Sequence, residues 1–153
     1  MEGFYEALPA NLKEQHRNRE IEVGDVYYMR VEGVDHPKYF IVVGKHENNV
    51  SLATVYVNTE DTYYELNPTL RSLQKEALKE DYDFLKYNSY IDCSNIIPRN
   101  ISLIQDTFNR DKDIFVGVVN DNQVDDIIRN LIDSPNVKGK TCKRYGFYDR
   151  LSI

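Results

Sequence analysis

Two adjacent apolar runs constrain the fold of this chain more than any other feature. The runs are YFIVV, which begins at Tyr39, and VSLATVYV, which begins at Val50, and the polar stretch GKHENN joins them. Both runs are rich in β-branched and aromatic residues, so the segment predicts a β-hairpin with a polar turn. Three polar residues, Lys38, Asn58 and Thr59, flank the outer ends of the runs. They are either solvated strand ends or the working end of a small barrel.

Further strands are predicted on both sides of this hairpin. The stretches GDVYYMRVEG (24–33), YDFLKYNSYIDCSNII (82–97) and DIFVGVV (113–119) have the β-branched and aromatic composition of strands. YFIVV and DIFVGVV are apolar at consecutive positions, which is typical of strands buried on both faces. The stretch NISLIQ (100–105) follows Pro98, and we expect it to continue the preceding strand or to pair with it.

A first helix is predicted to begin at Asn67. Asparagine is a preferred capping residue, and Pro68 would occupy the first helical position. Leu70, Leu73 and Ala77 then recur at positions i, i+3 and i+7, which predicts an amphipathic helix of about three turns.

The clearest helix is predicted over 122–133, with Asn120 or Asp121 as its cap. Its apolar residues fall at i, i+3, i+4, i+7 and i+8 and form one continuous stripe: Val124, Ile127, Ile128, Leu131 and Ile132. Strands and helices do not alternate regularly along the chain. The order therefore favours an α+β fold, a small bent antiparallel β-barrel with two or three helices packed outside it.

The 153 residues have the length of one domain. We expect an N-terminal extension over 1–20, a single barrel domain over 21–137 and a polar C-terminal tail over 138–153. The tail contains the one basic cluster, KGKTCKRYGFYDR. This cluster is either solvated surface or a phosphate-binding patch.

Charge and residue usage exclude several classes of function. There are 19 basic and 25 acidic residues, a net charge of −6, which argues against broad nonspecific binding to nucleic acid but leaves room for a small basic cleft. The two cysteines form no disulfide framework and no zinc motif, so no metal or cofactor is expected. No apolar run reaches the roughly 18 residues of a membrane span, and the N-terminus lacks the order of a secretory signal. We therefore expect a cytoplasmic protein without membrane contact.

The pattern of the strands and of the last helix resembles the MazF/PemK/Kid-type toxins, of which this chain looks like a divergent member. Three stretches carry the resemblance. GDVYYMRVEG looks like the opening strand, HPKYFIVVG with SLATVYVNT like the paired strands, and SYIDCSNI with DIFVGVVNDNQVDDIIRNLI like the late strands and C-terminal helix. Together they cover roughly 24–134, and the segment 60–86 looks like an enlarged loop. The resemblance implies an SH3-like small barrel.

The resemblance also implies an activity, metal-independent cleavage of single-stranded RNA. In that chemistry the 2′-hydroxyl attacks its own phosphate and needs a proton acceptor, a cation and an acid nearby. The family has an Arg at the start of the second strand and a Thr or Ser at the end of the third. These positions fall on Lys38 and Thr59 here. Lysine departs from arginine because it provides a point charge without the planar two-point contact.

Three further residues complete the site that the resemblance implies. His36 is the neutral-pH base closest in sequence to Lys38, so Lys38, Thr59 and His36 are the catalytic candidates. Arg30 could supply the missing guanidinium, and Asn58 begins the turn beside Thr59, so both are substrate-binding candidates.

Alternatives to this site remain open. Cys93 and His36 could form a nucleophilic pair, although a cysteine in an apolar strand is usually buried and inert. The twelve tyrosines are either base-stacking platforms or ordinary packing residues.

The resemblance implies two protein partners, a second copy of the chain in a two-fold dimer and a small antitoxin-like protein. The alternative function is a catalytically silent barrel that acts as a protein- or nucleic-acid-binding module. The acidic net charge and the lysine at position 38 favour this alternative.

Overall fold

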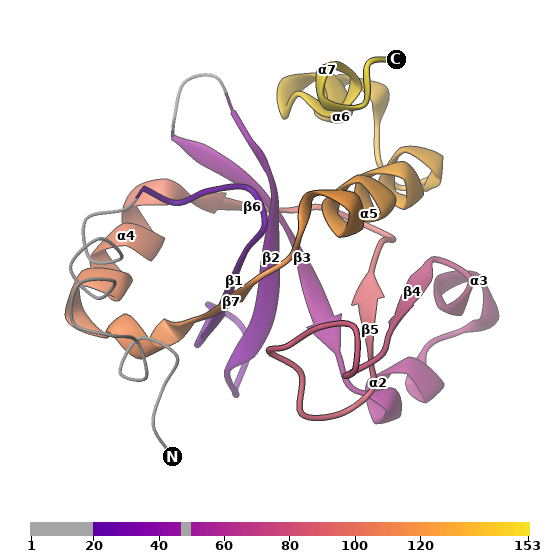
Figure 1. Ribbon diagram of the computed structural model, residues 1–153. Helices are drawn as coiled ribbons and strands as arrows, with labels where there is room; N and C mark the ends of the chain where they lie inside the picture. Colours follow the sequence, from indigo (N-terminus) through magenta and orange to yellow (C-terminus); the bar gives the residue numbers. More distant parts are fainter. Residues whose placement is uncertain (1–19, 47–49) are drawn as a thin grey trace.

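The hairpin predicted from the two apolar runs lies at the centre of a seven-stranded antiparallel sheet (Figure 1). The computed structural model describes residues 20–46 and 50–153. Its strands are β1 (Asp25–Met29), β2 (Lys38–Lys45), β3 (Ser51–Asn58), β4 (Gln74–Ala77), β5 (Ser89–Asp92), β6 (Ile97–Asn100) and β7 (Phe115–Val118). Its helices are α2 (Glu60–Glu65), α3 (Pro68–Arg71), α4 (Ile101–Arg110), α5 (Asp121–Asp133), α6 (Gly139–Arg144) and α7 (Phe147–Leu151), with a 3-10 turn η1 (Lys112–Ile114).

The strands run in the order β4-β5-β3-β2-β1-β7, and β6 pairs with β3 outside this path. The outer edge of β3 is shared, because its first half pairs with β6 and its end pairs with β5. The α+β antiparallel architecture is therefore as expected. The sheet is open, however, because β4 and β7 end the path without pairing with each other in the described part of the chain. The expected closed barrel does not form.

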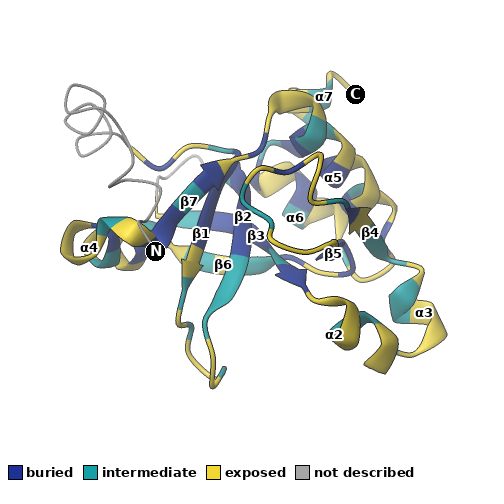
Figure 2. Cartoon of the chain, turned by 60° about the horizontal axis from the view of Figure 1, so that its bottom comes forward, coloured by how far each residue is buried: buried dark blue, intermediate teal, exposed yellow. Residues whose placement is uncertain are grey.

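Helices cover both faces of the central strands, with α4 on one side and α5, α6 and α7 on the other (Figure 1). Alternate residues of each strand point to opposite faces, so the sheet has two hydrophobic cores. One core contains Ile41 and Val55 and packs against α5, and the other contains Phe40 and Leu52 and packs against α4. Figure 2 shows that buried residues concentrate on the central strands, whereas α2 and α3 have no buried residue.

The predicted last helix is confirmed as α5. Asn120 and Gln123 form a capping box, in which each side chain accepts a hydrogen bond from the other residue's backbone N–H. The stripe of Val124, Ile127, Ile128 and Leu131 is fully buried in the core.

The strand predicted over 82–97 forms only at Ser89–Asp92 and at Ile97, the first residue of β6. Two further predictions of secondary structure were wrong. The helix capped by Asn67 begins as expected but ends after one turn at Arg71, because Gln74–Ala77 pairs with β5 as strand β4. The stretch NISLIQ is not a strand but the first half of α4, whose N-cap is Asn100. Ile104 and Phe108 of α4 are buried against the sheet, which fixes the helix there.

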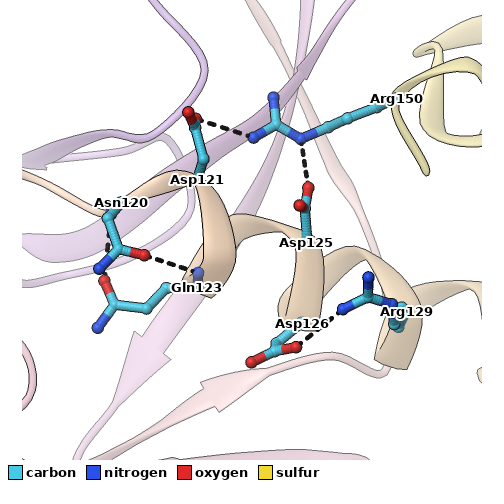
Figure 3. Close-up of polar contacts among 7 residues, drawn as sticks. All are labelled: Asn120, Asp121, Gln123, Asp125, Asp126, Arg129 and Arg150. Carbon is cyan, nitrogen blue, oxygen red and sulfur yellow. Dashed lines mark hydrogen bonds and ion pairs between the residues drawn. The ribbon is translucent and has the colours of Figure 1, made fainter.

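The segment 138–153 is a folded part of the core and not the solvated polar tail that we expected. It forms α6 and α7, in which Cys142, Tyr145 and Phe147 are buried. Arg150 of α7 reaches α5, where its guanidinium donates hydrogen bonds to Asp125 at 2.8 Å and Asp121 at 3.1 Å (Figure 3). The expected N-terminal extension, 1–20, lies outside the described residues except for Glu20.

Candidate functional site

Lys38 and Asn58 meet at the open end of the central hairpin. Lys38 is the first residue of β2 and Asn58 the last residue of β3, and Lys38 Nζ donates a hydrogen bond of 2.6 Å to Asn58 Oδ1. Asn58 is buried, with 8% of its surface exposed, whereas Lys38 is half-buried. The two residues are therefore not independent solvated strand ends.

Tyr56 and Arg99 extend this pair along one face of the sheet. Tyr56 lies two residues before Asn58 on β3, so both side chains point to the same face. Lys38 Nζ lies 5.1 Å from the centre of the Tyr56 ring, a cation–π distance. Arg99 of β6 donates from Nη2 to Tyr56 Oη at 2.8 Å, and its guanidinium lies 4.7 Å from the centre of the Phe40 ring.

An aromatic stack continues from Asn58 in the opposite direction. Asn58 is the register partner of Tyr90 on β5. The Tyr90 ring stacks on Tyr63 of α2 at 3.9 Å with an interplanar angle of 8°, and the Arg71 guanidinium lies 5.9 Å from the Tyr63 ring centre. Arg71 is held there by hydrogen bonds to the backbone oxygens of Tyr63 and Tyr64.

These contacts form one continuous surface, which we call the cation–aromatic row. It consists of Arg71, Tyr63, Tyr90, Asn58, Lys38, Tyr56 and Arg99. All of these except Asn58 are partly exposed. The row thus contains three cations and three tyrosine rings: Lys38, Tyr56, Tyr90 and Arg99 belong to the sheet, and Tyr63 of α2 and Arg71 of α3 extend it beyond β5.

The row continues into an open groove of about 850 Å³ between the end of β1 and helix α4. Arg99 lines this groove, as does Met29, which is the register partner of Lys38. The exposed Leu103 of α4 contributes to its apolar wall. An extended ligand on the row could therefore place a flat apolar group into the groove.

Partial burial changes the acid–base behaviour of Lys38. Desolvation lowers the pKa of its ammonium group, and the negative charge of Asp92 opposes part of this effect. Asp92 is fixed by hydrogen bonds from Gln74, from the backbone of Ser94 and from the Ser94 hydroxyl. A lysine with a lowered pKa can lose its proton more readily, which a general base requires.

Thr59 takes a different position from the one that the sequence suggested. Its Oγ1 accepts a hydrogen bond from the backbone of Thr62 at 3.4 Å and caps α2. It directly follows Asn58 in extended backbone, so its side chain leaves the face that carries Lys38. Thr59 lines a depression with Lys79 and Lys86, and Lys38 is not among the residues that line it.

His36 and Arg30, the two expected assisting residues, both contact Asp35. His36 is exposed in the β1–β2 loop, and its Nδ1 is 2.8 Å from a carboxylate oxygen of Asp35. This hydrogen bond and the charge of the imidazole lower the pKa of Asp35. Arg30 donates to the backbone oxygen of Asp35 and lines the groove. The guanidinium group that lies near Lys38 is that of Arg99, which shares the Tyr56 ring with Lys38.

Cys93 is not a nucleophile in this structure. Its side chain is buried in the α5 core, and burial raises the pKa of its thiol to about 12. A thiol with such a pKa is protonated at neutral pH, so the alternative of a pair with His36 has no geometric support.

Sequence reasoning missed Tyr56, Arg99, Tyr90 and Tyr63 as members of one site. A local signal existed only for Tyr56, which alternates with Asn58 in SLATVYVN. Tyr90 and Arg99 come from segments that follow β3 by up to about forty residues, and strand pairing brings them to it. Tyr63 of α2 and Arg71 of α3, which was also missed, join the row through ring contacts.

A scan against protein-family models and a search of curated proteins both find no match for this chain. Within residues 20–46 and 50–153, no group of three or more His, Cys, Asp or Glu side chains could hold a metal ion. In the same residues, no helix is both long and apolar enough to cross a membrane.

Proposed function

We propose that this protein binds single-stranded RNA along the cation–aromatic row. The observation that carries the proposal is that Arg71, Lys38 and Arg99 each lie within cation–π distance of a partly exposed tyrosine ring of one continuous row. Bases stack on aromatic side chains and phosphates bind cations, and every base offers a face for stacking. The resemblance of the β-strands to those of RNA-cleaving toxins favours RNA over DNA as the single-stranded ligand.

The acidic net charge is compatible with this binding mode. A net charge of −6 disfavours wrapping of a long polyanion, but a row with three cations needs only a short segment. With three cations the salt dependence of binding is modest, with a slope of log K against log salt of about −2 for a single strand. Stacking then contributes most of the affinity, at about 1–3 kcal/mol per base.

Cleavage of the bound RNA is the second candidate function, and the geometry around Lys38 favours it. The fraction of Lys38 that has lost its proton, which grows as pH rises, would accept the proton of the 2′-hydroxyl as its oxygen attacks the adjacent phosphorus. Arg99 would stabilise the charge of the phosphorane, and the Tyr56 hydroxyl would protonate the departing 5′-oxygen. The products are a 2′,3′-cyclic phosphate and a 5′-hydroxyl, and no metal takes part.

The proposal includes the family that the sequence resembles. We propose that the sheet is an opened and enlarged form of the SH3-like barrel of MazF/PemK/Kid-type toxins. The β1–β2–β3 meander and the packing of α5 on it support this relationship. It brings with it a homodimer, a small antitoxin-like partner and a cytoplasmic location.

Binding is tested by fluorescence anisotropy with a labelled mixed-sequence RNA 20-mer, single-stranded or in a duplex. We expect the single strand to bind, and Lys38→Met or Arg99→Gln to weaken binding about tenfold, which corresponds to ~1.4 kcal/mol. The matched control is Arg110→Gln, because Arg110 is an exposed cation on α4 outside the row. Equal weakening by the control, or no binding by the wild type, would refute the proposal.

Cleavage is tested separately on a gel in the presence of EDTA. Lys38→Ala should reduce cleavage at least about tenfold, as for loss of a general base. Tyr56→Phe keeps the stacking ring but removes the hydroxyl, so it should retain binding and lose cleavage. A wild type that binds RNA but leaves it intact is a silent binding module.

A further inference from the structure

A second cavity lies at the edge of the sheet, between α6 and the β5–β6 connection. Its volume is about 360 Å³, and three cations line it: Lys138, Lys140 and Arg144. Asn95 and Asn136 add side-chain amides to its wall, and none of the described acidic residues lines it. We call this cavity the basic pocket. The segment that supplies its cations is the basic cluster that the sequence left open as solvated surface or phosphate-binding patch.

The cations of the basic pocket have no negative partner in the described parts of the chain. The ion pairs found there join other residues, such as Arg150 with Asp121 and Arg129 with Asp126. In a protein with more acidic than basic residues, three cations around one concave surface without a carboxylate form an uncompensated positive site.

The folded C-terminal segment fixes the backbone that carries these exposed cations. Cys142 and Tyr145 of the same segment are buried in the core, and Tyr145 also lines the basic pocket. The hydroxyls of Tyr145 and Ser51 lie 2.7 Å apart, which ties the end of α6 to the start of β3. Binding an anion here therefore costs less backbone ordering than binding one to lysines on a loose tail.

The basic pocket adjoins the cation–aromatic row across a single edge strand. Pro98 lines the basic pocket, and the next residue of β6, Arg99, belongs to the row. Successive residues of a strand point to opposite faces, and among the described strands β6 pairs only with β3. A chain that leaves the row at Arg99 therefore needs to cross only β6 to reach Lys140.

We infer that the basic pocket binds phosphate groups of the same RNA strand beyond the end of the row. This inference rests on the proposed function and extends the RNA path from the sheet face around its edge. Lysine and arginine with amide donors are the side chains that contact nucleic-acid phosphates without reading sequence. The site should therefore add affinity for longer RNAs with no sequence preference.

The first test compares Lys140→Glu with Lys143→Glu by RNA anisotropy at several salt concentrations. Both substitutions change the charge equally on the same helix, but Lys143 does not line the basic pocket. Lys140→Glu should weaken binding of a 20-mer about tenfold and reduce the salt slope by about 0.7 for each lost phosphate contact. Lys143→Glu should change affinity less than about twofold. Equal effects of the two variants, or none, would overturn the inference.

Folding is checked by thermal melts of both variants. A glutamate at position 140 lies in the first turn of α6, where the helix dipole favours negative charge, and one at 143 lies in the last turn, where it does not. If either substitution lowers stability, it is therefore the control, Lys143→Glu, and not Lys140→Glu. Lys140→Gln serves as a second variant and should give about half the effect in log K, because it changes the charge by one unit instead of two.

The second test separates this inference from the proposed function. Inorganic phosphate is titrated into isotope-labelled protein, and the amide signals of Asn95 and Asn136 are followed by NMR. We expect shifts in the wild type that Lys140→Glu abolishes and Lys143→Glu preserves. If the wild type shows NMR shifts with phosphate but does not bind RNA, the pocket is a phosphate site and the proposed RNA path is refuted. A third outcome is RNA binding that depends on the row but not on Lys140, with no NMR shifts on addition of phosphate. It would refute phosphate binding by the basic pocket and leave the proposed function standing.

Discussion

Lys38 Nζ and Asn58 Oδ1 close the open end of the central hairpin with a hydrogen bond of 2.6 Å. The bond joins the start of β2 to the end of β3, and Tyr56 and Arg99 continue from it across the sheet face. A half-buried ammonium in this position has a lowered pKa, which makes the row sensitive to pH.

The first prediction concerns RNA affinity at alkaline pH. Since burial places the pKa of Lys38 below its usual 10.5, the ammonium charge is complete below the lowered pKa and is lost as pH rises through it. Affinity for single-stranded RNA should therefore fall before pH 10.5 is reached. Lys38→Arg stays charged over this range and should show a flatter anisotropy profile between pH 7 and 10. If the wild type and Lys38→Arg have pH profiles of the same shape, the group that titrates is not Lys38.

The second prediction concerns the pH dependence of the free energy of unfolding, and it follows from the same lowered pKa of Lys38. The unfolded chain binds more protons than the folded chain between the lowered pKa and 10.5, so wild-type stability gains from Lys38 as pH rises through this window. Lys38→Met lacks this gain. The free energy of unfolding of the variant minus that of the wild type should therefore decrease between pH 8 and 10.5 in urea titrations. A constant difference would show that Lys38 has the same pKa in both states.

A third prediction tests the stripe of α5. Ile128 is fully buried, so Ile128→Ala should lower the free energy of unfolding by about 2–5 kcal/mol through lost burial and a residual cavity. The neighbouring Arg129→Ala is the control, because its exposed ion pair with Asp126 should contribute less than about 1 kcal/mol. Urea denaturation measures both. An unchanged midpoint for Ile128→Ala would show that the stripe is not in the core.

The fourth prediction concerns the folded C-terminal segment. Phe147 of α7 is fully buried beside Gly44, where a Cβ atom would lie 3.0 Å from the Phe147 ring. Phe147→Ala should cost about 3–5 kcal/mol, as for a buried aromatic residue. Arg150→Gln should cost about 1 kcal/mol, because the ion pairs with α5 are partly exposed. Hydrogen exchange of 139–151 should become faster in both variants, and protease resistance unchanged by Phe147→Ala would contradict this packing.

The fifth prediction is a homodimer, which follows from the proposed family. Strand β7 ends the sheet path among the described strands, and its last residue, Val118, is 56% exposed, so we expect β7 to pair with a second chain. Light scattering at micromolar concentration should give about twice the chain mass of 17.9 kDa. Val118→Lys should return the protein to a monomer. A wild-type mass equal to one chain would rule out this dimer.

The sequence by itself determined the central hairpin, β1, β7 and α5. In each of these the signal is local, either consecutive β-branched residues or an apolar stripe next to a capping residue. Asn120 and Gln123 lie three residues apart and form the capping box directly from their spacing. Lys38 and Asn58 were also placed at one end of the hairpin, because a tight turn fixes which strand ends meet.

Tertiary pairing decided the segments whose local signals were ambiguous. Leu70, Leu73 and Ala77 have helical spacing, but the backbone of Gln74–Ala77 gains hydrogen bonds from β5 and buries Ala77, which outweighs the helical preference. The run ISLI has neither length nor period enough to separate strand from helix. It is a helix because Ile104 and Phe108 fit the face of the sheet that α5 leaves uncovered. The segment 138–153, expected to be a tail, folds because the Phe147 ring packs against Gly44, which has no side chain to block it.

The candidate site shows the same division between local and distant information. Thr59 was expected in the site from the resemblance alone, yet α2 begins directly after β3 and uses the Thr59 hydroxyl as a cap. Arg99 and Tyr90 enter the site only because β3 shares its outer edge between β6 and β5. Strand register of this kind depends on contacts between residues far apart in sequence. A local pattern can therefore show that a strand exists, but only the assembled sheet determines which side chains it brings together.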